Sequence, residues 1–86
     1  MEQELSDPRS RVAGQKQVLQ SIDDGRAKKV FVADDADGQI KRLIEKSAAD
    51  SGIECVRVES MDRLGSAAGI RVGAACAAIV AAEDKK

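Results

Sequence analysis

Strand-like and helix-like segments alternate along nearly the whole chain, and this alternation constrains the fold more than any other feature of the sequence. Val30–Ala33 is continuously apolar, as expected of a central strand that is covered on both faces. Glu54–Val58 is also strand-like, with Cys55 and Val56 flanked by charged residues. Ala74–Val80 is predicted to form a second central strand, although its alanines would equally tolerate a helix. Strands interleaved with helices predict a three-layer α/β/α sandwich on a small mixed sheet of about four strands.

The first helix is predicted over Gln15–Asp24. At about 100° per residue, its apolar side chains fall on one face; these are Val18, Leu19 and Ile22. A different arc of the helix carries polar side chains, namely Lys16, Gln17, Gln20 and Asp24. Gly25 is expected to end the helix, because glycine tolerates the left-handed conformation of a helix cap.

Two further helices are marked by residues that cap their starts and end them. Asp37 is predicted to cap a helix that stops at Gly52. The buried stripe of this helix is expected to contain Ile40, Leu43, Ile44 and Ala48. Ser60 is predicted to cap a short helix that Gly69 ends. The inward-facing residues of the short helix are predicted to be Met61, Leu64 and Ala68.

A chain of 86 residues has room for one compact domain, so we assign residues 1–86 to a single domain whose first eight residues are frayed. Cys55 and Cys76 lack the spacing of a zinc or redox pair and are expected to be small buried residues in a reducing cytosol. The acidic, polar start is unlike a signal peptide, and the longest apolar run is too short to cross a bilayer. We therefore expect a soluble, cytoplasmic monomer with no membrane partner.

The charge is distributed unevenly along the chain, although the net charge is only −1. Residues 1–8 carry three acids and no base, and residues 30–86 carry ten acids and eight bases. Residues 9–29 carry six bases against Asp23 and Asp24, a local charge of +4. The six bases are Arg9, Arg11, Lys16, Arg26, Lys28 and Lys29. A local basic region matters more for binding phosphate than the total charge does.

Three segments of the sequence resemble a known family in the expected order. They are Gly14–Gln17, Val32–Asp37 and Val58–Gly73, and the likeness covers roughly residues 10 to 82. Together they resemble the L-seven-Ae family of ribosomal proteins, whose members bind kink-turn RNA, and within it the small bacterial YbxF-like branch. The resemblance implies an α/β/α fold and a short edge strand at Arg11–Gly14. It also implies an RNA partner, either ribosomal RNA or a riboswitch, and contact with the ribosome.

Kink-turn RNA presents sheared G·A pairs, a sharply bent backbone and an extruded nucleotide, features that proteins recognise by shape and by exposed base edges. In the family, the residues matching Lys16 and Gln17 read the guanines of the G·A pairs, and the YbxF-like branch resembles this chain in having Lys-Gln there. The loop after the third strand, here Glu59–Gly69, would pack against the extruded nucleotide. The candidate RNA-binding residues are Gly14, Gln15, Lys16, Gln17, Gln20, Lys28, Glu59, Ser60, Met61, Leu64, Gly69 and Ile70. Core packing is the alternative interpretation for Met61, Leu64 and Ile70, and for Leu64 it is the one that we favour.

The chain departs from the family at two positions on the predicted RNA face. The family usually has a lysine at Gln20 and often a basic residue at Asp24, and each lost cation would weaken phosphate binding. Gly38 also replaces a common proline, which concerns helix entry. An alternative function is therefore a protein-interaction module of the same fold with weak or lost RNA binding. Gln20, Asp24 and the net acidity favour that alternative, whereas Lys16, Gln17 and the basic segment 9–29 oppose it.

No enzyme motif is recognisable. Asp34, Asp35 and Asp37 form the densest carboxylate cluster and could in principle hold Mg²⁺ or transfer protons. The interpretation that we favour is a strand-to-helix turn whose aspartates cap the helix. The glycines at 65, 69 and 73 do not form a phosphate-binding loop. We therefore expect neither catalysis nor a cofactor or metal.

Overall fold

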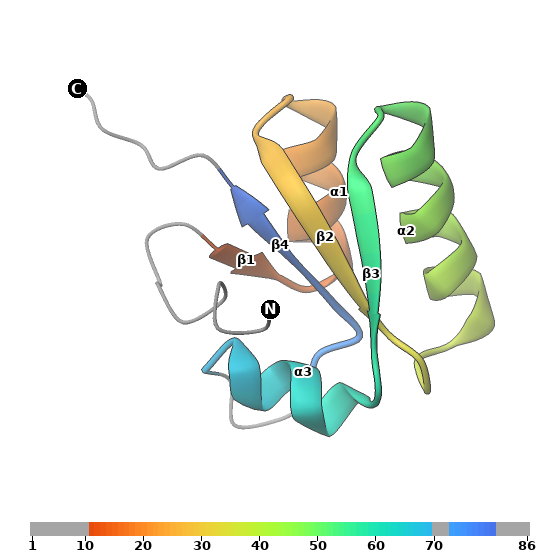
Figure 1. The fold of residues 1–86 in the computed structure, drawn as a ribbon, viewed down its shortest axis with the longest axis vertical. Helices are drawn as coiled ribbons and strands as arrows, with labels where there is room; N and C mark the ends of the chain where they lie inside the picture. Colours follow the sequence, from red (N-terminus) through yellow and green to blue (C-terminus); the bar gives the residue numbers. More distant parts are fainter. Residues whose placement is uncertain (1–10, 70–72, 81–86) are drawn as a thin grey trace.

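The computed structural model describes residues 11–69 and 73–80. Four strands and three helices alternate along these residues, as the sequence predicts (Figure 1). In chain order they are β1 (Arg11–Ala13), α1 (Gln15–Asp23), β2 (Ala27–Ala33), α2 (Gly38–Asp50), β3 (Glu54–Val58), α3 (Met61–Ala67) and β4 (Cys76–Val80). Within the predicted strand Ala74–Val80, the residues Cys76–Val80 form β4, so the alternative of a helix is wrong.

The four strands form one mixed sheet in the order β1-β4-β2-β3. β4 pairs antiparallel with both β1 and β2, whereas β2 and β3 pair in parallel. Consequently β1, β2 and β3 all run in the same direction. Each of them is followed by a helix, so α1, α2 and α3 all begin at the same end of the sheet, the end where β4 starts. The predicted edge strand and the two predicted central strands are all confirmed.

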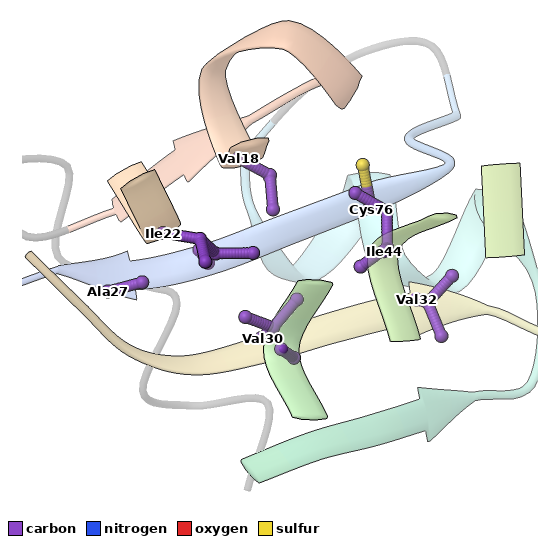
Figure 2. Packing of buried hydrophobic residues seen from close by; sticks show 9 residues of the cluster. Val18, Ile22, Ala27, Val30, Val32, Ile44 and Cys76 are labelled. Atoms are coloured by element: carbon purple, nitrogen blue, oxygen red, sulfur yellow. The ribbon is translucent and has the colours of Figure 1, made fainter. Parts of the chain in front are cut away.

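The helices cover both faces of the sheet, which confirms the three-layer sandwich. α1 and α2 pack on one face, where Figure 2 shows Val18 and Ile22 of α1 and Ile44 of α2 directed at the sheet. Val30 and Val32 of β2 lie beneath them, and each of these five side chains is at most 6% exposed. Alternate residues of a strand point to opposite faces. The neighbours of these valines in β2 therefore face the other layer.

The second core lies between the sheet and α3. Phe31, the only aromatic residue, is fully buried there together with Ala33, Leu64 and Ala77. The alanine-rich strand β4 contributes small side chains to both faces, since Ala78 belongs to the core under α1 and α2. Small side chains on a central strand allow the helices on both sides to approach the backbone closely.

Capping residues set the helix boundaries as predicted. Asp37 Oδ1 accepts a hydrogen bond from Gln39 N at 2.8 Å, at the start of α2. Ser60 Oγ accepts from Arg63 N at 3.1 Å, at the start of α3. The glycines that follow the three helices all have positive φ; they are Gly25, Gly52 and Gly69.

Two residues are less buried than the sequence predicts. Leu43 is 40% exposed, at the border of the apolar stripe of α2. Cys55 is only partly buried because β3 is an edge strand, whereas Cys76 is fully buried and this raises the pKa of its thiol to about 11. Cys76 is therefore a protonated, unreactive core residue at neutral pH.

Within residues 11–69 and 73–80, no helix is long and apolar enough to cross a membrane.

Candidate nucleic-acid interface

The start of α1 leaves backbone N–H groups without a hydrogen-bond partner in the helix. Gly14 is the N-cap residue, with φ 97° and ψ 147°, a conformation available almost only to glycine. Its own N–H donates to Cys76 O at 3.0 Å, and its carbonyl accepts from Val18 N at 2.9 Å. No side chain caps this helix, and its first turn carries no acidic residue. The N–H groups of residues 15–17 and the positive end of the helix dipole therefore face outward.

The side chains around these N–H groups are polar and exposed. Gln15, Lys16 and Gln17 form the first turn of α1, and all three are exposed to solvent. The side of Gly14 where a Cβ would lie is also open, since a Cβ built there would have no atom beyond its chain neighbours within 4 Å. A phosphate or a base edge could thus contact the backbone N–H groups as well as the side chains.

The other two helix starts at this end of the molecule are closed by side chains. Asp37 caps α2. α3 is capped twice, because Ser60 accepts from Arg63 N and Asp35 Oδ1 accepts from Met61 N at 2.8 Å. Asp62 adds a negative charge to the first turn of α3. Among the three described helices, α1 alone therefore has a start that is both uncapped and free of carboxylates.

Backbone hydrogen bonds connect the start of α1 to the start of α3. Besides the bond from Gly14 to Cys76, Ala74 N donates to Met61 O at 3.0 Å. A Cβ on Gly73 would lie 3.0 Å from Met61 Cβ and 3.2 Å from its carbonyl carbon, so a side chain there would be tightly packed against Met61. Residues 73–76 thus lie between the two helix starts. This bridging role was not predicted, although the run of glycine and alanine at residues 73–75 is a signal of close backbone approach.

The candidate residues of the Glu59–Gly69 segment lie at the two ends of α3. Glu59 is exposed, Ser60 and Met61 are half-buried, and these three residues adjoin the start of α3. Gly69 is separated from Met61 by the length of α3, about 12 Å. It lies beside Arg11, whose guanidinium Nη2 would be 2.9 Å from a Cβ at position 69. The end of α3 therefore packs against β1, the strand that leads into α1.

Two further candidates do not join the surface at the helix starts. Leu64 is fully buried, in agreement with the core-packing interpretation, and offers no contact surface. Lys28 is exposed near the beginning of β2, at the end of the sheet opposite the helix starts and roughly 16 Å along the strand from Ala33. Gln20 does lie close, one turn beyond Lys16 on α1. Ile70 lies outside the described residues.

The aspartate cluster after β2 is used for capping and ion pairing, as we favoured from the sequence. Asp35 and Asp37 cap helices, and Asp34 Oδ1 lies 3.2 Å from Arg57 Nη1. Arg57 Nε also donates a hydrogen bond to Glu45 Oε2 at 2.9 Å. This bond raises the pKa of the Arg57 guanidinium above its ordinary value. No group of three or more His, Cys, Asp or Glu side chains in the described part of the chain could hold a metal ion.

Comparisons with known proteins agree on one family. The model of the ribosomal protein L7Ae/L30e/S12e/Gadd45 family matches residues 2–86. The chain is similar to large ribosomal subunit protein eL8 of Halobacterium salinarum, at 46% identity over 72 residues, which are 83% of this chain and 60% of that protein. It is also similar to RNA-binding protein YbxF of Geobacillus stearothermophilus, at 39% identity over 69 residues, 80% of this chain and 84% of that protein. The chain thus spans only about 60% of the length of the eL8 protein.

Solved structures show the same fold. The Giardia lamblia 15.5kD RNA binding protein superposes with a TM-score of 0.85 at 23% identity, covering 95% of this chain and 72% of that one. A Bacillus halodurans protein described as having unknown function superposes with a TM-score of 0.83 at 19% identity, covering 93% of this chain and 83% of that one. The names of the family and of the curated relatives are those of ribosomal and RNA-binding proteins, not of enzymes.

Proposed function

Because the chain belongs to the ribosomal protein L7Ae/L30e/S12e/Gadd45 family, we propose that it binds RNA through kink-turn motifs, as a cytoplasmic ribosome-associated or riboswitch-stabilising protein. The observation that carries this proposal is the start of α1. It is the one described helix start that no side chain caps, and exposed Lys16 and Gln17 flank its N–H groups.

The groups at this helix start match the chemistry of a sheared G·A pair. Lys16 can donate to guanine O6 or N7, and the Gln17 amide can both donate and accept. The N–H groups of the first turn can bind a phosphate oxygen of the bent backbone, and the dipole of α1 favours that negative charge. Gly14 leaves the backbone open to close approach. Glu59, Ser60 and Met61, which adjoin residues 73–76, would contact the RNA beside it.

Binding would act by selecting one RNA conformation. A protein that contacts only the kinked form shifts the population of the RNA towards that form by its differential affinity. This needs neither a cofactor nor a chemical step.

The competing function is a protein-interaction module with weak or lost RNA binding. Gln20 is neutral, and Asp23 and Asp24 are exposed carboxylates on the same helix, which gives this alternative its support. The two functions differ in what the start of α1 would bind, so a direct RNA-binding measurement separates them.

The test is a gel-shift titration with a kink-turn duplex and a matched duplex whose G·A pairs are replaced by Watson–Crick pairs. We expect a dissociation constant on the order of micromolar or tighter for the kink-turn, and much weaker binding to the matched duplex. Equal affinity for the two duplexes would rule out kink-turn recognition. Absence of binding to either would leave the protein-interaction module as the better account.

A further inference from the structure

A groove runs along α1 towards the last turn of α2, and its charge changes sign from one end to the other. Its lining residues are Lys16, Leu19, Gln20, Ile22 and Asp23 of α1 with Ser47, Asp50 and Ser51 beside α2. Lys16 stands at the end that adjoins the proposed RNA site. Asp23 and Asp50 both line its far end.

The polar residues of α1 continue this change of sign in a single stripe. At about 100° per residue, Gln20, Asp23 and Asp24 all lie within about 80° of Lys16 around the helix axis. With a rise of about 1.5 Å per residue, the two carboxylates stand about 10 to 12 Å along the axis from Lys16. The stripe therefore runs from positive through neutral to doubly negative.

The two carboxylates of the stripe, Asp23 and Asp24, differ from Asp50 at the far end of the groove. Asp50 forms an exposed ion pair with Lys46 at 3.8 Å. Neither Asp23 nor Asp24 forms an ion pair within residues 11–69 and 73–80, and both are exposed. The last turn of α1 has no basic residue either. A phosphate strand that followed α1 beyond Gln20 would meet this negative charge directly.

The distances decide how far the repulsion reaches. The Debye length at physiological ionic strength is about 8 Å, which is shorter than the separation of Lys16 from either carboxylate. Asp23 and Asp24 therefore weaken phosphate binding at Lys16 only slightly. A phosphate placed beside Gln20 or beyond lies well within one Debye length of them and is repelled.

We infer that Asp23 and Asp24 limit the RNA footprint on α1, so that affinity does not grow with the length of the flanking stems. This inference rests on the proposed RNA-binding function. The bent junction of the RNA is held at the first turn of α1, and the flanking stem turns away from the second half of the helix. A longer stem along α1 adds no affinity.

The inference is tested with one kink-turn RNA whose two flanking stems are trimmed or extended in turn, and with the charge-neutral, near-isosteric variant Asp23→Asn/Asp24→Asn. The native protein should bind all of these RNAs within about twofold of one another at physiological ionic strength. The double variant should gain roughly three- to tenfold affinity when the stem that lies along α1 is extended, which is only one of the two stems. For the trimmed RNA the gain should be less than about twofold. The gain should shrink as salt is raised.

Matched variants separate a local effect from a change in total charge. Asp24→Asn and Glu54→Gln remove the same single charge, but Glu54 begins the edge strand β3, at the end of the sheet opposite the helix starts. Only Asp24→Asn should show the stem-dependent gain. An equal gain on trimmed and extended RNAs, or no gain on any of them, would overturn the inference.

Lys16→Ala distinguishes failure of the inference from failure of the proposed function. If Lys16→Ala leaves binding of the trimmed RNA intact, the start of α1 is not the RNA site and both proposals fall. If it abolishes that binding while Asp23→Asn/Asp24→Asn gains equally on every stem, the site stands and only the footprint inference is lost.

Discussion

At the residue scale, two glycines with positive φ occupy different surroundings. Gly14, at φ 97°, has open space where a Cβ would lie, whereas Gly69, at φ 75°, lies against the guanidinium of Arg11. The first position is open to a ligand. The second is a packed end of α3 at which a side chain would have to displace Arg11.

We expect Gly69→Val to lower the free energy of unfolding by about 1–3 kcal/mol, because a β-branched residue is strained at positive φ. Gly14→Val should cost at least as much stability, because φ 97° and ψ 147° are available almost only to glycine, although its side chain would meet no neighbour. The RNA affinity of the folded protein should fall further for Gly14→Val, since Gly14 lies at the proposed site. Urea denaturation and gel shifts on both variants measure the two quantities separately. A larger loss of affinity from Gly69→Val in folded protein would contradict this division.

Lys16→Ala and Gln17→Ala should each weaken RNA binding by about 1–3 kcal/mol if their side chains read base edges. Both side chains are exposed, so circular dichroism should not change. Lys28→Ala is the matched control: it removes the same charge from the opposite end of the sheet and should leave affinity nearly unchanged. Comparable losses from Lys16→Ala and Lys28→Ala would indicate non-specific attraction to phosphate.

At the element scale, α1 combines an open start with an acidic end. Carboxylates in the last turn of a helix oppose its dipole. Neutralising Asp23 and Asp24 should therefore leave the fold intact or slightly more stable, which keeps the footprint experiment free of folding defects. Gln20 is the neutral position between the two charged ends of the stripe.

We expect Gln20→Lys to tighten RNA binding and to steepen its dependence on salt, by about 0.7–0.9 in the slope of log affinity against log salt if one phosphate contact is added. Ala49→Lys adds the same charge at an exposed position of α2, away from the stripe. It should change neither the affinity nor its dependence on salt. If Gln20→Lys has no effect at low salt, no phosphate lies within reach of this turn of α1.

The elements themselves were predictable because their signals are local. Helix starts were marked by Asp37 and Ser60, whose side chains bond N–H groups two or three residues away. Contacts between distant segments left no such signal. Neither the capping of Met61 N by Asp35 nor the packing of Gly69 against Arg11 follows from residue spacing, because both depend on how the strands pair.

At the scale of the whole molecule, the direction of the strands determines which end of the sheet carries the proposed RNA site. Three strands run in parallel, so three helices start at one end of the sheet, and the antiparallel strand β4 brings residues 73–76 to the same end. Periodicity predicted the layers, the order of the elements and the α/β class. It did not predict which end of the sheet each candidate would occupy, and for that reason Lys28 was grouped with residues from the opposite end.

The uncapped start of α1 also determines how fast individual amide protons exchange with solvent. In the free protein, the amides of Gln15, Lys16 and Gln17 should exchange at nearly the rate of an unfolded peptide, since they lack helical partners. The bonded amides of Gln39 and Met61, at the other two helix starts, should exchange more slowly. Adding kink-turn RNA should slow the three α1 amides selectively, and slow exchange there before any RNA is added would contradict an open helix start. Deuterium uptake, resolved by residue in NMR spectra, would thus report backbone contact with RNA without any mutation.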